Sequence, residues 1–202
     1  KTTDGGKNWA RLAGGLPTGR IGRIGLDVYQ KNPKILCAVV ENGNRRAPTE
    51  REAEQDKRRG GTPPSRTLGN EVFRSDDGGA TWRKINAGFE AALNKSPYAF
   101  NQLRLDPNDP DTVYITGVSI ASTNDGGKTW KGLDWPSDGV MQKAFGDWRC
   151  LWIDPLDSRR MIFGSDGGVN ISYDRGLTCH HAYNLPLTEF YAIGVDMEDP
   201  YN

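Results

Sequence analysis

A short pattern occurs four times in this chain and constrains its fold more than any other feature. The consensus is Ser/Thr-x-Asp-x-Gly-x-x-Trp, and each copy is called a box below. The copies span residues 2–9, 75–82, 123–130 and 172–179, and Cys179 replaces the tryptophan in the last one. A pattern that recurs at a nearly fixed period is typical of a repeat fold.

The size of the repeat indicates which fold. The box aspartates are separated by 73, 48 and 49 residues. A second marker, a short apolar run ending in aspartate, recurs with them; its aspartates are Asp27, Asp106, Asp154 and Asp196. The first interval is longer because it contains an insert, residues 41–70. Without that insert each unit has roughly 45–50 residues, which matches one blade of a β-propeller.

Short runs rich in Val, Ile, Tyr and Trp lead up to each marker and each box, as expected for half-buried strands. We therefore predict an all-β fold: a β-propeller segment of four-stranded blades with box hairpins, forming a fragment of a larger ring. The expected units are a partial blade 1–15, a blade 16–86 with the insert 41–70, a blade 97–134, a blade 148–183 and a partial blade 188–202.

The composition of the box indicates a folding role. An aspartate can accept hydrogen bonds from N–H groups two residues on, and glycine adopts positive φ without steric cost. The tryptophan offers apolar area to a neighbouring blade, so Cys179 predicts a weaker contact. A catalytic or calcium-binding role is disfavoured because no segment has the spacing of a calcium loop. The residues given this structural role are Asp4, Trp9, Asp77, Trp82, Asp125, Trp130 and Asp174.

The boxes resemble the Asp-box, or BNR, repeat of sialidases, sortilin-type receptors and xyloglucan-cleaving hydrolases. Residues 16–25, 73–79, 151–155 and 165–172 are similar to bacterial secreted proteins with a sortilin-like propeller, which are often labelled glycosyl hydrolases. The resemblance implies further blades in the same protein and an extracellular or periplasmic location. It supports the fold more than any activity, because one fold hosts many functions.

Composition excludes several classes of function. Lys plus Arg and Asp plus Glu each number 26, so no basic excess is available to bind nucleic acid. No apolar run has the roughly 18 residues that a membrane span needs. Three cysteines do not suggest a disulfide framework, and Cys37 and Cys150 are expected in the core. We predict no metal and no cofactor, since the adjacent His180 and His181 would point to opposite faces of a strand.

The order of strands in a blade predicts where a ligand binds. The marker turn and the box lie on one face, whereas the more variable connections lie on the opposite face, where binding residues are expected. Candidate ligand-binding residues there are Arg20, Trp135, Trp148 and Glu189, with core packing an equal alternative for Trp148. Exposed aromatic rings beside carboxylates suit a sugar.

Two functions follow as hypotheses. The first is a binding propeller of a secreted or cell-envelope protein that binds a glycan or a peptide. The second is a xyloglucanase-like glycoside hydrolase with Asp147 and Asp166 as catalytic carboxylates. The sequence before residues 151–155 lacks the histidines that the bacterial proteins it resembles often carry there, which disfavours the second hypothesis. No arginine cluster of the sialidase kind is visible either. A third possibility is that the site lies on other blades.

The insert also allows two interpretations. Thr49 and Glu52 form a capping-box signature that predicts a short helix through Arg59. Because the segment is almost wholly polar, we expect a solvated, partly disordered loop. The alternative is a lid or an arm that contacts a partner.

Overall fold

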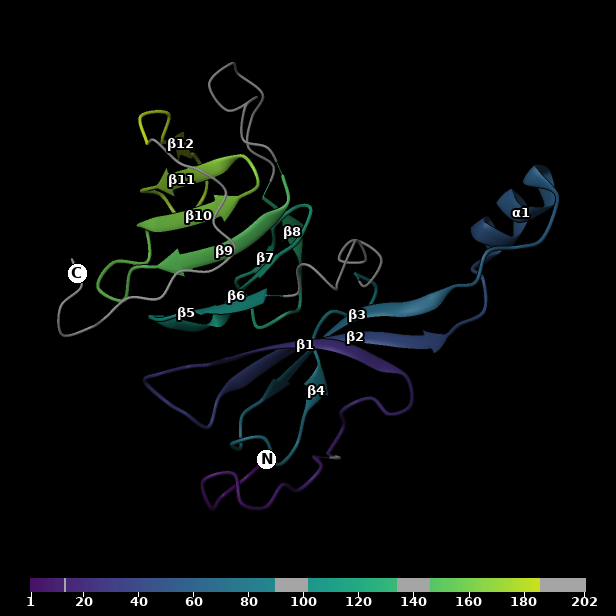
Figure 1. Ribbon diagram of the computed structural model, residues 1–202, viewed down its shortest axis with the longest axis horizontal. Helices are drawn as coiled ribbons and strands as arrows, with labels where there is room; N and C mark the ends of the chain where they lie inside the picture. Colours follow the sequence, from purple (N-terminus) through teal and green to yellow (C-terminus); the bar gives the residue numbers. More distant parts are fainter. Residues whose placement is uncertain (13, 90–101, 134–145, 186–202) are drawn as a thin grey trace.

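The computed structural model describes residues 1–12, 14–89, 102–133 and 146–185. Within these ranges the chain forms three four-stranded antiparallel sheets, here called blades A, B and C (Figure 1). The all-β fold of four-stranded blades is therefore confirmed. Blade A consists of β1 (Ile21–Val28), β2 (Leu36–Arg45), β3 (Thr67–Ser75) and β4 (Arg83–Lys84). Blade B consists of β5 (Gln102–Asp106), β6 (Asp109–Thr116), β7 (Ala121–Thr123) and β8 (Lys131–Gly132). Blade C consists of β9 (Trp148–Ile153), β10 (Met161–Ser165), β11 (Gly168–Ser172) and β12 (His180–His181).

In each blade, strands that follow one another in the sequence are neighbours in the sheet. The chain reverses direction at every turn, so the first and third turns of a blade lie on one face of the molecule. We call this the box face, because the third turn is the box. The second turn and the starts of β1, β5 and β9 lie on the opposite face. The predicted division into two faces is thus confirmed.

The blades pack sheet against sheet, because successive side chains of a strand point to opposite sides. Between blades A and B, the buried side chains are Tyr29, Cys37, Val39, Val72, Ile85, Leu103, Leu105, Val113 and Ile115. Between blades B and C, they are Tyr114, Ile120, Trp148, Leu151, Ile153, Met161, Phe163 and Cys179. In blade B, the alternation along β6 supplies both interfaces, since Val113 and Ile115 face blade A and Tyr114 faces blade C.

The box tryptophans differ in their packing. Trp82 is buried with Phe73 and Val40 on the side of blade A that faces away from blade B, next to Leu12 and Leu16 of the N-terminal segment. Trp130 packs against the A–B core and donates its indole N–H to the Ile85 carbonyl of blade A at 2.8 Å. Trp9, in contrast, is 73% exposed, because the structure describes no blade packed against it.

The cysteines differ from expectation at one position. Cys37 is buried in the A–B core, where burial raises the pKa of its thiol to about 12. Cys150 is exposed, so its predicted place in the core is wrong; it lies opposite Gly164 on the side of blade C that faces away from blade B. Cys179 is buried in the B–C core and so makes the interblade contact expected of the tryptophan it replaces.

The insert is an ordered arm and not the partly disordered loop that its composition predicts. Strands β2 and β3 extend into it, pairing as far as Arg45 and Thr67. The remaining residues, 46–66, are called the arm; they carry helix α1 (Glu50–Arg59), which projects beyond β2 and β3, away from blades B and C (Figure 1). The predicted capping box between Thr49 and Glu52 is present, and no residue of α1 is buried.

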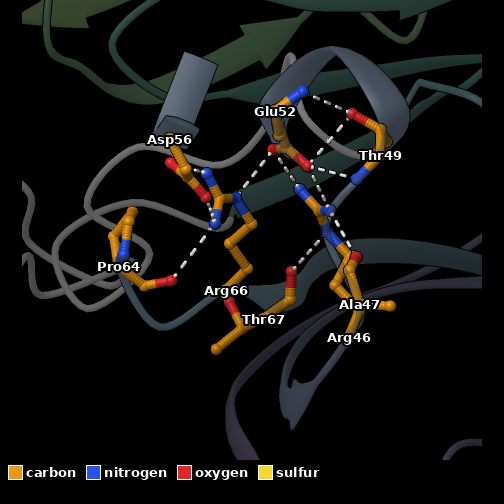
Figure 2. Close-up of polar contacts among 8 residues, drawn as sticks. All are labelled: Arg46, Ala47, Thr49, Glu52, Asp56, Pro64, Arg66 and Thr67. Atoms are coloured by element: carbon orange, nitrogen blue, oxygen red, sulfur yellow. Dashed lines mark hydrogen bonds and ion pairs between the residues drawn. The ribbon is translucent and has the colours of Figure 1, made fainter. Parts of the chain in front are cut away.

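Ion pairs take the place of a hydrophobic core in the arm (Figure 2). Glu52 receives two hydrogen bonds from the Arg46 guanidinium, both at 2.7 Å. Asp56 receives two from the Arg66 guanidinium, both at 2.9 Å, and Arg66 also lies 3.3 Å from Glu52. Because Arg46 and Arg66 flank the helix in sequence, these contacts tie α1 to both strands of the hairpin. Within the described ranges, no helix is long and apolar enough to cross a membrane.

Candidate ligand-binding face

On the box face, the serine, threonine and aspartate side chains of each box are occupied by hydrogen bonds within their own turn. In the second box, the Ser75 hydroxyl donates to the Asp77 carboxylate at 2.8 Å and accepts from the Gly79 N–H at 2.8 Å. Asp77 then accepts from the Thr81 N–H at 2.9 Å and from its hydroxyl at 2.6 Å. Asp77 thus accepts from the backbone N–H four residues further on. The bond to an N–H two residues on, which we expected of the aspartate, is accepted by the Ser75 hydroxyl from the Asp77 N–H.

The seventh residue of the box, directly before the tryptophan or Cys179, has a structural role that the consensus does not include. Thr81, Thr129 and Thr178 each donate both the backbone N–H and the hydroxyl to the box aspartate, and Asn8 does so with its side-chain amide. The signal was available, since all four copies carry a threonine or an asparagine there.

These contacts also fix the charge of the box aspartates. The hydrogen bond from the Thr81 side chain, followed by that from its backbone, lowers the pKa of Asp77 to about 2. The backbone N–H of Asn8 and the Thr2 hydroxyl lower the pKa of Asp4 to about 2. A carboxylate held ionised by three donor groups is a poor general acid. Among the described residues, no group of three or more His, Cys, Asp or Glu side chains could hold a metal ion.

The boxes of blades A, B and C are each also hydrogen-bonded to the marker turn of their own blade. The N–H groups of Gly78, Gly126 and Arg175 donate to the carbonyls of Lys34, Asp111 and Arg159, at 2.8, 3.0 and 3.1 Å. The marker turns are linked to one another as well: the Asn108 amide of blade B donates to the Ser158 hydroxyl of blade C at 2.8 Å. The box face is therefore a structural brace.

The opposite face brings together candidate residues of blade C. Trp148 at the start of β9 pairs with Ser165 at the end of β10. Asp147 and Asp166 directly flank this pair, so both carboxylates belong to the same end of one strand pair. The antiparallel pairing of β9 with β10 therefore brings Asp147 and Asp166, which are far apart in the sequence, to the same end of the blade.

Asp147 is held in an unusual backbone conformation, with φ at 61°. Its N–H donates to the Val118 carbonyl at 3.2 Å, and the Trp148 N–H donates to the Gly117 carbonyl at 2.8 Å. Both bonds connect the start of β9 in blade C to the β6–β7 connection of blade B. Positive φ costs energy in a residue with a side chain and is found frequently at functional sites.

Asp166 forms a two-point ion pair with Arg149 of β9, at 2.7 and 3.0 Å. Both side chains are partly exposed to solvent. The guanidinium lowers the pKa of Asp166 below its usual value. This carboxylate is therefore ionised and oriented, which suits the binding of hydroxyl or amide groups and does not suit the donation of a proton.

Arg20 lies on the same face, in blade A, directly before β1. Its N–H donates to the Asn44 side-chain carbonyl at 3.0 Å, and its carbonyl accepts from the Gly43 N–H at 2.8 Å. The backbone is thus fixed, and the residue is exposed. Among the described residues no contact joins Arg20 to Asp147 or Asp166, so the three share a face without forming one cluster.

Trp148 is not a ligand platform in this structure. Its ring is 3% exposed and packs edge-on against Phe163, with 5.8 Å between ring centroids. A register shift between Gly164 and Ser165 accompanies this placement, and the bond to Gly117 holds the strand against blade B. Of the two alternatives for Trp148, core packing is correct. The other two candidates, Trp135 and Glu189, lie outside the described residues.

Comparison with known proteins supports the fold. No family model and no curated protein matches the sequence. The GH74 xyloglucanase of Xanthomonas campestris matches with a TM-score of 0.55 at 15% identity, over 80% of this chain and 23% of the enzyme. An ancestral GH74 enzyme matches with a TM-score of 0.53 at 15% identity, over 89% of this chain and 20% of the enzyme. YCF48 from Cyanidioschyzon merolae matches with a TM-score of 0.48 at 16% identity, over 82% of this chain and 38% of YCF48.

The chain thus spans between a fifth and a quarter of the length of the two GH74 enzymes. At such low identity the likeness concerns the fold alone. Together with the three stacked sheets, it identifies the chain as a segment of a β-propeller.

Proposed function

We propose that this chain is part of a ligand-binding propeller that binds a glycan or a peptide on the face opposite the boxes. The observation that carries the proposal is the contrast between the two faces. On the box face, the aspartates are saturated by hydrogen bonds from their own turns. On the opposite face, Asp147 has a constrained backbone and Asp166 is an ionised, partly exposed carboxylate.

A glycan is the first ligand to test, because a carboxylate and a guanidinium side by side can bond several sugar hydroxyls. The neighbour from Xanthomonas campestris is named a xyloglucanase, which makes xyloglucan oligosaccharides a reasonable first probe. On the resemblance of the boxes to those of secreted propellers, we extend the proposal to an extracellular or periplasmic location and to further blades in the same protein.

The test is a binding measurement by calorimetry with neutral glycan oligosaccharides and unrelated peptides. We expect Asp147→Asn to weaken binding about tenfold, the usual effect of losing one charged hydrogen bond. Asp157→Asn is the matched control, because it makes the same change in an exposed turn of the box face. Equal losses in both variants, or no binding to any probe, would contradict the proposal.

A second candidate is glycoside hydrolysis, favoured by the two carboxylates at one end of the β9–β10 pair. It would require Asp147 as the acid, since Arg149 keeps Asp166 ionised. In the complete protein, Asp147→Asn would then abolish release of reducing sugar from a β-glucan while leaving ligand binding largely intact. A complete protein that cleaves no polysaccharide in a broad panel would exclude this candidate.

A further inference from the structure

The arm contains a hollow that the proposed function does not use. It is an open depression of about 560 Å³ between the second half of α1 and the chain returning to β3. The lining residues are Gln55, Asp56, Arg58, Arg59 and Arg66. It shares no residue with the entry to blade C, so it forms a separate surface feature.

The hollow carries net positive charge. Asp56 is neutralised by the two-point ion pair with Arg66, in which both side chains are largely buried. Arg58 pairs with Glu54, but both are well exposed, and such pairs contribute little. Arg59 has no ion-pair partner among the residues that the structure describes. Two guanidinium groups therefore remain to meet a ligand.

The shape of the hollow is set before any ligand arrives. Arg66 is fixed by Asp56 and Glu52, and it also donates to the Pro64 carbonyl at 3.3 Å (Figure 2). Glu52 in turn holds the start of the helix through the Thr49 N–H at 2.8 Å. A prearranged site loses less conformational entropy on binding than a flexible one.

The lining identifies the class of ligand. Guanidinium groups recognise carboxylate or sulfate by paired hydrogen bonds. The Gln55 amide and an Asp56 oxygen beside them can bond hydroxyl groups. Among the described residues that line the hollow, none has an aliphatic or aromatic side chain to receive the apolar residues of a peptide. We propose that the arm binds the anionic sugars of an acidic polysaccharide, such as one built of uronic acids.

The dipole of α1 alone does not account for this arrangement. Basic residues are favoured in the last turn of any helix, which explains Arg58 and Arg59 singly. Arg66 comes from the returning chain and lines the same hollow, where Asp56 and Glu52 hold it in place. An anionic ligand would thus be met by Arg58 and Arg59, at a hollow whose shape Arg66 helps to fix.

The experiment titrates the protein with oligogalacturonate at low and moderate salt, and the double variant Arg58→Gln/Arg59→Gln removes the two available charges. Neither residue belongs to the Glu52–Asp56 network, so we expect an unchanged amide NMR spectrum for blades A to C. Binding should fall at least about tenfold, in line with the loss of charged hydrogen bonds. Lys57→Gln is the matched control, because Lys57 is exposed on the same helix turn but does not line the hollow; it should change binding less than about twofold.

Three results would overturn the proposal. They are no binding of oligogalacturonate by the unaltered protein, equal losses in Lys57→Gln and the double variant, and tighter binding of oligoglutamate than of oligogalacturonate. The last result would identify an acidic peptide as the partner. Asp147→Asn should leave uronate binding unchanged, so failure of this inference and failure of the proposed function can be told apart.

Discussion

Asp77 stabilises its turn as a charged group, and this makes the turn sensitive to acid. Its folded-state pKa of about 2 lies below the usual value of 3.8. A depressed pKa means that the stabilisation is complete above the usual value and is lost as the pH falls through the folded value. We expect the Asp77 carboxyl carbon to titrate near pH 2 in an NMR experiment, and Thr81→Val to raise that midpoint. A midpoint near 3.8 in the unaltered protein would contradict this account.

Glycines of the boxes differ in what surrounds them, which gives a matched pair of substitutions. At Gly127 a Cβ atom would lie 2.5 Å from both the Cβ and the carbonyl oxygen of Ile85, whereas at Gly78 it would meet nothing within 4 Å. Both residues have positive φ, so alanine costs about 1 kcal/mol at either. We expect Gly127→Ala to cost about 1–3 kcal/mol more than Gly78→Ala, because blade A must move. Urea unfolding of both variants measures this, and equal costs would show that the A–B contact is loose.

The arm shows how an element can fold without a core of its own. Its helix buries no residue, and Glu52 joins the cap to the guanidiniums of Arg46 and Arg66. Hydrogen bonds from the Arg46 side chain, then from the Thr49 backbone, lower the pKa of Glu52 well below its usual range. The arm is thus stabilised mainly by contacts among its own residues, and Arg46 also donates to the Thr67 carbonyl at the start of β3.

We therefore expect Glu52→Gln to loosen the arm alone. Amide hydrogen exchange over residues 50–59 should accelerate at least about tenfold, because the substitution weakens a cap and two ion pairs. Exchange in β5, β6 and β10 should not change. Glu54→Gln, which alters only an exposed pair with Arg58, serves as the control. Faster exchange throughout the sheets would mean that the arm supports the whole fold.

At the scale of the molecule, each interface repeats one rule: the side of a blade that faces the next is apolar and covered. Blade C departs from it, since Trp152 and its strand partner Ile162 are 45% and 38% exposed on the side away from blade B. We expect another blade to cover this side in the assembled protein, as blade B covers blade A.

Without such a cover, this surface should make the chain associate at high concentration. Light scattering should show that Trp152→Ser/Ile162→Ser reduces association, whereas Leu156→Ser, in an exposed turn of the box face, does not. A chain that stays monomeric at every concentration would argue that the face is stable in water.

Much of the fold could be predicted from the sequence because the box is a local device. The side-chain hydrogen bonds inside the box of Asp77 join residues at most four positions apart in the chain. The helix through Arg59 was predictable for the same reason, since its cap joins Thr49 to Glu52. The order of the arm was not, because its ion pair between Asp56 and Arg66 depends on how the hairpin closes.

For the candidate site too, local features could be predicted from the sequence and long-range contacts could not. The sequence by itself determined the period of the blades, their corners and the division of the sheets into two faces, because these depend on alternation along strands and on short-range bonds. Only the tertiary structure decided that Trp148 packs in the core, that Arg149 holds Asp166 and that the arm converges on a hollow. Those outcomes depend on which strands become neighbours and in which register, and a shift of one residue reverses the side to which a chain segment points.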